Sequence, residues 1–146
     1  SSLRRALRPL TDRPTLSIVI PAYDAAATIG ATLTSVFASA ERTALDVVVV
    51  DDGSNDGAAL RDALAVYSDV RLIAHEHNRG MCAARNSGIA ASRGDIVTIL
   101  DADDTLVSDW HITFLRLRSH WPAECRNFCY RGVPAKLDLH CYRHCW

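Results

Sequence analysis

The sequence of 146 residues predicts an α/β protein in which helices flank a mostly parallel sheet. Four short apolar, β-branched runs between residues 16 and 100 predict the strands, because continuous apolar runs are typical of strands buried on both faces. Helical spacing of apolar residues fills the three intervals between the runs, which favours right-handed βαβ units. Polar residues follow every run, and in such a sheet they collect along one edge.

The predicted strands are short and end in polar or turn residues. The first, 16–21, reads LSIVIP and ends in a proline, and the second, 46–51, reads DVVVVD. The third, 70–74, reads VRLIA, and the fourth, 95–100, reads DIVTIL. All four lie in the part of the chain with the clearest pattern, so they define the expected sheet.

The predicted helices follow three of these strands. Asp24 and Asp56 are candidate N-terminal caps of the first two helices. Each of these helices has one apolar face: Ile29, Leu33, Val36, Phe37 and Ala40 in the first, and Leu60, Ala63, Leu64 and Tyr67 in the second. The third, at about 80–92, is rich in small residues and can pack closely. A further helix is expected from 108 to about 118.

The pattern divides the chain into a domain with two flanking segments. Residues 1–14 are expected to be an N-terminal linker, residues 15–119 the α/β domain, and residues 120–146 an irregular tail with no clear period. The tail carries four of the five cysteines, at 125, 129, 141 and 145, together with His140 and His144. This set allows a zinc site, but incidental thiols are the favoured interpretation because the spacing is loose.

The bulk properties exclude several classes of function. The formal net charge of −1 gives no global field that would attract nucleic acid. The apolar runs are too short to span a bilayer, so we expect no transmembrane segment. Cys82 is the only cysteine of the body, which indicates a cytoplasmic protein without a disulfide framework, although a peripheral position at a membrane is open.

Three carboxylates follow the fourth predicted strand. Asp101, Asp103 and Asp104 lie within four positions, and like charges this close repel each other unless a cation lies among them. If the segment is extended, Asp101 and Asp103 point the same way and present hard oxygen donors suited to Mg²⁺ or Mn²⁺. An Asp-x-Asp triplet occurs by chance in a chain with this many aspartates, so the triplet alone decides little.

Other polar residues at the strand ends suggest a nucleotide. Tyr23 offers an aromatic face for a base, and Asp51 or Asp52 can accept hydrogen bonds from a base or ribose. Arg79 or Arg85 could pair with phosphate. His75 and His77 could suggest a metal site, but loop histidines are more often solvated.

Three stretches carry a resemblance to a known family: LSIVIPAYDAAATIGATLTSVFAS, VVVVDDGSNDG and HNRGMCAARNSGIAASRGDIVTILDADDTL. In order and spacing they resemble the nucleotide-binding half of family 2 glycosyltransferases, which have the Rossmann-like GT-A fold. The match covers about 16–106. It implies a metal-dependent, inverting transfer of a sugar from a nucleotide-diphosphate donor to an acceptor hydroxyl on a glycan, lipid or protein.

The resemblance also implies roles for individual residues. Pro21, Ala22 and Tyr23, next to Asp24, would line the nucleoside pocket, and Asp52, with Asp51 beside it, would contact the base. Arg79, Gly80 and Arg85 would lie along the donor. Asp101, Ala102 and Asp103 would form the Asp-x-Asp motif that holds Mn²⁺ or Mg²⁺, with Asp103 the expected direct ligand.

Two departures from the family pattern affect the interpretation. Asp24 stands where the family usually has asparagine, and the acceptor segment that carries the catalytic base is not found after Trp110. The sequence therefore favours a truncated glycosyltransferase whose general base is unidentified. Two alternatives are open: a catalytically inactive domain that binds a nucleotide sugar, and a phosphoacceptor receiver module.

Overall fold

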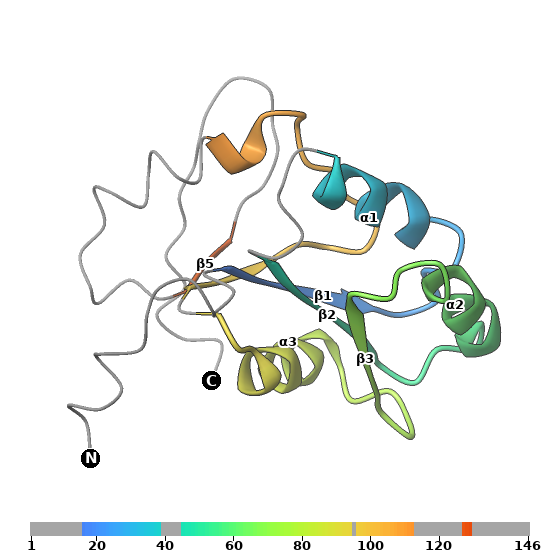
Figure 1. Ribbon diagram of the computed structural model, residues 1–146. Helices are drawn as coiled ribbons and strands as arrows, with labels where there is room; N and C mark the ends of the chain where they lie inside the picture. Colours follow the sequence, from blue (N-terminus) through green and yellow to red (C-terminus); the bar gives the residue numbers. More distant parts are fainter. Residues whose placement is uncertain (1–15, 39–44, 95, 113–126, 130–146) are drawn as a thin grey trace, which may run out of the picture.

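The computed structural model describes residues 16–38, 45–94, 96–112 and 127–129. Within them, the strands and helices run in the order β1 (Leu16–Ala22), α1 (Ile29–Phe37), β2 (Leu45–Asp51), α2 (Gly57–Leu64), β3 (Val70–Ala74), α3 (Met81–Ala91), β4 (Ile96–Ile99) and β5 (Asn127–Cys129). The described strands form one sheet in the order β3-β2-β1-β4-β5, and all its pairs are parallel. The predicted parallel α/β architecture is confirmed (Figure 1).

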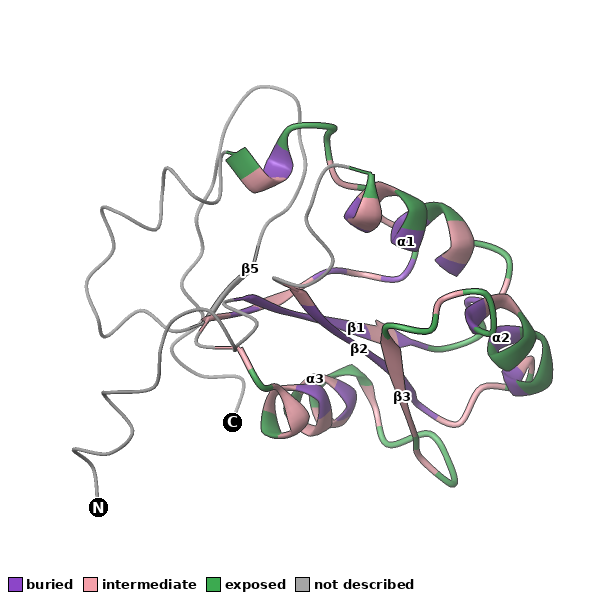
Figure 2. Cartoon of the chain, viewed as in Figure 1, coloured by how far each residue is buried: buried purple, intermediate pink, exposed green. Residues whose placement is uncertain are grey.

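The apolar runs form strands because the sheet is covered on both faces. Ile18, Ile20, Val47 and Val49 pack against α1 and α2 in one cluster. The alternate residues Val19, Val48 and Val50 pack in a second cluster with Ala84 of α3. Figure 2 shows β1 and β2 buried between these layers. Each fully buried aliphatic side chain contributes about 1.5–3 kcal/mol to folding. If apolar and polar residues alternated along these strands, one face of the sheet would have no apolar core.

Helix α3 lies closer to the sheet than a helix of larger residues could. Ala84 is fully buried against the strands. A Cβ atom added to Gly88 would lie 2.2 Å from Cγ1 of Val19, which is closer than any real contact. The small residues of this helix therefore permit the close packing that the sequence predicts.

The strand order reverses between β1 and β4. The chain proceeds outward from β1 through β2 to β3, then crosses to the other side of β1 to form β4. In open parallel sheets, ligands bind beyond the carboxyl ends of the strands at such a reversal. A receiver module has the order 2-1-3-4-5, so the observed order contradicts that alternative.

The C-terminal region differs from the expected irregular tail at three residues. Asn127–Cys129 form β5, which continues the sheet beyond β4. A segment this short has too few residues to show a strand period, and its pairing depends on the free edge of β4. The helix expected at 108–118 begins at Trp110 and is described as far as residue 112.

Other predictions for the ends of the chain fall on residues that the structure does not describe. These include the linker at 1–14 and the cysteines at 125, 141 and 145, so the zinc alternative is untested. Among the described residues, every helix is too short or too polar to cross a bilayer.

Candidate functional site

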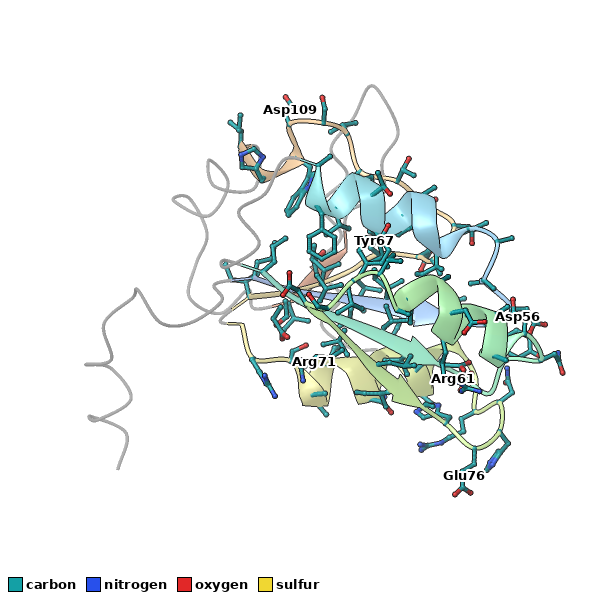
Figure 3. The ribbon with its side chains drawn as sticks, turned by 45° about the vertical axis from the view of Figure 1, so that its right-hand side comes forward. Asp56, Arg61, Tyr67, Arg71, Glu76 and Asp109 are labelled. Carbon is teal, nitrogen blue, oxygen red and sulfur yellow. The ribbon has the colours of Figure 1, made fainter. Side chains whose placement is uncertain are left out.

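The candidate site is built from the loops that follow β1, β2, β3 and β4. Figure 3 shows Asp56 and Glu76, from two of these loops, at the end of the molecule toward which β2 and β3 point. Pro21 is half-buried, Ala22 is buried, and the Tyr23 side chain is 50% exposed. The structure thus brings the predicted residues of the strand ends to one edge of the sheet.

The loop after β1 is fastened to the loop after β2. Asn55 donates from its backbone N–H to Oδ1 of Asp24 at 2.7 Å and from Nδ2 to Oδ2 at 3.0 Å. The same Nδ2 lies 3.3 Å from the hydroxyl of Tyr23, and Ser54 accepts the backbone N–H of Asp24 at 3.0 Å. These bonds hold Asp24 in a left-handed conformation with φ of 50°. The hydrogen bond from the Asn55 side chain, with its backbone N–H, lowers the pKa of Asp24.

The two aspartates predicted as helix caps have other partners. Helix α1 begins at Ile29 with Thr28 at its N-cap, so the prediction that Asp24 caps it is wrong. Asp56 does occupy the N-cap position of α2, but its carboxylate makes no cap bond there. Instead, Oδ2 of Asp56 accepts the backbone N–H of Ala26 at 2.9 Å. Both carboxylates therefore connect loops that are far apart in the sequence.

Asp51 and Asp52 are each only 3% exposed. Oδ1 of Asp51 accepts the backbone N–H of Ser54 at 2.9 Å. Asp52 accepts the backbone N–H groups of Arg79 at 2.9 Å and Gly80 at 2.8 Å, so its carboxylate lies inside the loop between β3 and α3. Burial alone would raise the pKa of Asp52, but hydrogen bonds from His75 and these two N–H groups outweigh it and lower the pKa.

The side chain of His75 is buried, contrary to the expectation that both loop histidines are solvated. Its side chain is 6% exposed, with Nδ1 at 2.7 Å from Oδ1 of Asp52 and Nε2 at 2.8 Å from Oγ of Ser87. His77, two residues later, is exposed as expected. A single loop thus contains one anchored and one solvated histidine.

The acidic residues after β4 lie on a turn and not on an extended segment. The backbone N–H of Asp104 donates to the carbonyl of Asp101 at 3.1 Å, which closes the turn. The expectation that Asp101 and Asp103 share one side of an extended strand is therefore wrong. Oδ1 of Asp101 lies 3.3 Å from Nη2 of Arg85, so a protein cation partly offsets the crowded charge. Asp103 is exposed, whereas Ala102 between the two is buried.

Helix α1 fixes this turn through hydroxyl groups. Oγ1 of Thr32, a fully buried residue, donates to the carbonyl of Ala102 at 2.9 Å. Oγ of Ser35 accepts the backbone N–H of Leu106 at 2.9 Å. The sequence does not predict the contacts of Thr32, Asn55 and His75, because their partners lie 70, 31 and 23 positions away. Their polar character within otherwise apolar or loop segments was the only available signal.

The residues of the turn fit a divalent cation that a substrate helps to bind. Within the described residues, there is no group of three or more His, Cys, Asp or Glu side chains that could enclose a metal. Asp101 and Asp103 instead offer two carboxylates on a turn whose Asp101 side chain is 41% exposed. Mg²⁺ is usually bound by one or two carboxylates together with substrate phosphates, so this donor set matches it.

Comparison with known proteins agrees with the fold. The chain is 42% identical over 102 residues to the succinoglycan biosynthesis protein ExoO of Rhizobium meliloti, covering 69% of this chain and 29% of that protein. It is 35% identical over 95 residues to the pre-mycofactocin glycosyltransferase of Mycobacterium tuberculosis, covering 65% of this chain and 19% of that enzyme. The chain therefore spans less than a third of the length of these relatives.

Solved structures give the same picture. A mannosyltransferase from Pyrobaculum calidifontis, in complex with GDP-Man and Mn²⁺, matches with a TM-score of 0.60 and 30% identity, covering 74% of this chain and 35% of that one. S. aureus TarS 1-349 in complex with UDP-GlcNAc matches in fold, with a TM-score of 0.65, 22% identity and coverage of 73% and 31%. The model of the family described as "Glycosyl transferase family 2" matches residues 17–117, and the chain belongs to this family.

Proposed function

We propose that the chain forms the donor-binding part of an inverting, metal-dependent glycosyltransferase that uses a nucleotide-diphosphate sugar. The observation that carries the proposal is the arrangement at the reversal of the sheet. There the exposed aromatic ring of Tyr23 follows β1, and the Asp101 and Asp103 carboxylates follow β4 beside Arg85. An aromatic face, a cation site and an arginine match the base, the diphosphate-bound metal and the phosphate of one ligand.

The nucleoside would lie against the loop after β1. Pro21, Ala22 and Tyr23 would line its pocket, with Tyr23 stacking on the base and Asp24 holding the loop in place through Asn55. Asp51 and Asp52 would close the floor beneath the base. Both Asp52 oxygens already accept hydrogen bonds from the protein, so a base that donates to Asp52 would share these oxygens with His75, Arg79 and Gly80.

The diphosphate would lie between the turn after β4 and the start of α3. Arg79 and Gly80 would border it, and Arg85 would move part of its hydrogen bonding from Asp101 to a phosphate oxygen. Nε of Arg85 is buried without a hydrogen-bond partner, so the same movement of the side chain would let this N–H donate to a phosphate oxygen as well. Asp101 and Asp103 would hold Mn²⁺ or Mg²⁺, which when bound supplies positive charge that stabilises the departing nucleoside diphosphate.

The acceptor site and the general base are not assigned to the described residues. An inverting transfer requires a base that removes the acceptor's proton as the hydroxyl attacks. The chain spans less than a third of the length of the relatives, and we propose that a glycan, lipid or protein acceptor binds outside the described residues. We place the activity in the cytoplasm or at a membrane surface.

A thermal-shift panel tests the proposal. UDP-GlcNAc, other UDP-sugars and GDP-Man are each added with and without Mn²⁺, and at least one should raise the melting temperature, more so with the metal. If no nucleotide sugar changes it under either condition, the proposal is wrong. Nucleotide binding without sugar transfer or donor hydrolysis would instead support the inactive binding domain.

The metal ligand is tested by Asp103→Ala. We expect this substitution to abolish the Mn²⁺-dependent part of the shift and to preserve the metal-independent part, because Asp103 is exposed and its loss disturbs no core. Asp109→Ala is the matched control, since Asp109 is also exposed and lies away from the β3–α3 loop (Figure 3). An Asp103→Ala protein with an undiminished Mn²⁺ effect would contradict the assignment.

A further inference from the structure

His75 connects three elements through its two ring nitrogens. It follows β3, it contacts Asp52 immediately after β2 through Nδ1 at 2.7 Å, and it contacts Ser87 of α3 through Nε2 at 2.8 Å. The side chains of His75 and Asp52 are 6% and 4% exposed. Buried polar groups of this kind need all their hydrogen bonds. Each residue of the series Asp52, His75 and Ser87 therefore fixes the orientation of its neighbour.

The loop from His75 to Gly80 is wrapped around the Asp52 carboxylate. Oδ1 accepts from both His75 and the backbone N–H of Arg79, and Oδ2 accepts from the backbone N–H of Gly80. On the other side, Gly53 packs so tightly that an added Cβ would lie 2.5 Å from the backbone carbon of His77. The position of Arg79 and Gly80 therefore depends on where this carboxylate points.

The hydrogen-bonding chemistry fixes the role of each nitrogen. Asp52 has a lowered pKa, so at neutral pH it is ionised and can only accept. Nδ1 of His75 must then carry the proton and donate it to Asp52. Nε2 faces Ser87 Oγ, which can donate to a neutral ring or accept from a protonated one.

An aspartate, a histidine and a serine joined in this way by hydrogen bonds also occur in hydrolases, but the surroundings of Ser87 differ from those of a catalytic serine. An acyl-transfer serine needs backbone N–H groups directed at the developing oxyanion. Ser87 lies inside α3, where the neighbouring N–H groups are committed to helical hydrogen bonds. The arrangement holds a loop in position and does not activate a nucleophile.

We infer that His75 is a positioning residue for the donor: by donating to Asp52 it holds the loop that carries Arg79 and Gly80 against the diphosphate. This inference rests on the proposed function, because the loop matters only if a nucleoside diphosphate binds there. Ser87 supports the ring from the far side and has the smaller effect, since its hydroxyl does not touch Asp52.

The first test requires no ligand. Long-range ¹H–¹⁵N correlation spectra of the histidine rings at neutral pH should show a protonated Nδ1 on His75, and this signal should change in Asp52→Asn. An unprotonated Nδ1 would overturn the inference, because the ring could not then donate to the carboxylate.

The second test measures dissociation constants for UDP and GDP with Mn²⁺ by calorimetry. His75→Leu should weaken the binding of whichever nucleotide binds by about tenfold or more, the effect of losing a hydrogen bond to a charged group. His75→Asn places an amide N–H where Nδ1 was, so it should stay within about threefold of the wild type. His75→Gln places its amide nearer Nε2 and should not rescue binding. The matched control is His77→Leu, an exposed histidine of the same loop, which should have no effect.

The outcomes separate the two hypotheses. A wild-type chain that binds neither nucleotide contradicts the proposed function itself. If the wild type binds and His75→Leu, shown to be folded by circular dichroism, binds equally well, the positioning role is wrong while the function stands. Equal losses of nucleotide affinity in His75→Leu and His75→Asn would also contradict the positioning role, because asparagine should restore affinity through its hydrogen bond to Asp52.

Discussion

Asp46 shows how a single buried carboxylate can join four parts of this fold. It lies near the amino end of β2, away from the candidate site. Oδ2 accepts from Oγ of Ser17 at 2.7 Å and from the backbone N–H of Arg93 at 2.8 Å, while Oδ1 accepts from Nε and Nη2 of Arg71. Oγ of Ser17 in turn accepts the backbone N–H of Gly94 at 2.8 Å. The carboxylate thus fixes the end of α3 against β1, β2 and β3.

The first stability prediction concerns this carboxylate. Asp46→Asn should lower the free energy of unfolding by about 2 kcal/mol or more, because Arg71 loses its charged partner and the amide cannot accept at both positions. Urea denaturation measures the change. Asp62→Asn, at an exposed position of α2, should shift the free energy by less than about 0.5 kcal/mol. Equal stability of the two variants would show that the Asp46 bonds contribute nothing net.

The same carboxylate predicts a pH dependence. Burial alone would raise the pKa of Asp46, but hydrogen bonds from Ser17, Arg93 and Arg71 outweigh it and hold the pKa below the ordinary value of 3.8. A group with a lowered pKa in the folded state stabilises the protein above the ordinary pKa, and that contribution is lost as the pH falls through the folded value.

The free energies of unfolding of the wild type and Asp46→Asn should therefore differ most above the ordinary pKa of 3.8, and the difference should shrink as the pH falls through the lowered pKa of the folded state. Urea denaturation of both proteins at each pH measures the difference. Asp24 and Asp52 also have lowered pKa values, but they are present in both proteins and cancel in the comparison. A difference that stays constant with pH would exclude ionisation of Asp46 as its source.

At the scale of elements, two helical glycines should respond in opposite ways to alanine. Gly88→Ala in α3 places a methyl group 2.2 Å from Cγ1 of Val19, so overpacking should cost about 1–3 kcal/mol. Gly30→Ala in α1 meets no atom within 4 Å and should stabilise by about 0.5–1 kcal/mol through helix propensity. Thermal unfolding of both variants measures the contrast, and stabilisation by both would show that α3 can move away from the sheet.

Strands and helices were predictable from the sequence where a local residue pattern determines them. The side-chain contacts that join these elements were not predictable. Apolar runs such as 46–51 predict buried strands because a parallel sheet demands them along its whole length. The side-chain roles of Asp24 and Asp56 could not be predicted, since an aspartate before a helix reads as a cap while its actual partner lies about 30 residues away. For the same reason the burial of His75 was missed, because Asp52 and Ser87 come from other elements.

At the scale of the whole molecule, the reversal in strand order brings together side chains that no local pattern connects. The resemblance of the three motifs named most of these residues, but it could not show how they are supported. Tyr23 is held by Asn55 of the loop after β2, whereas the Asp101 turn is held by Thr32 of α1 and Arg85 of α3. The proposed nucleoside and metal ends of the site therefore rest on different supports.

Separate supports predict that the two ends contribute independently to donor binding. Tyr23→Ala should weaken the binding of UDP or GDP by about tenfold or more, with or without Mn²⁺, because the base loses its stacking partner. Asp103→Ala should remove only the Mn²⁺-dependent gain. Calorimetric titration of both single variants and the double variant completes a cycle, in which the losses should add within about 0.5 kcal/mol. A larger coupling would mean that the aromatic and acidic ends move as one unit, and that the bond between Asn55 and Tyr23 does not isolate the ring from the rest of the site.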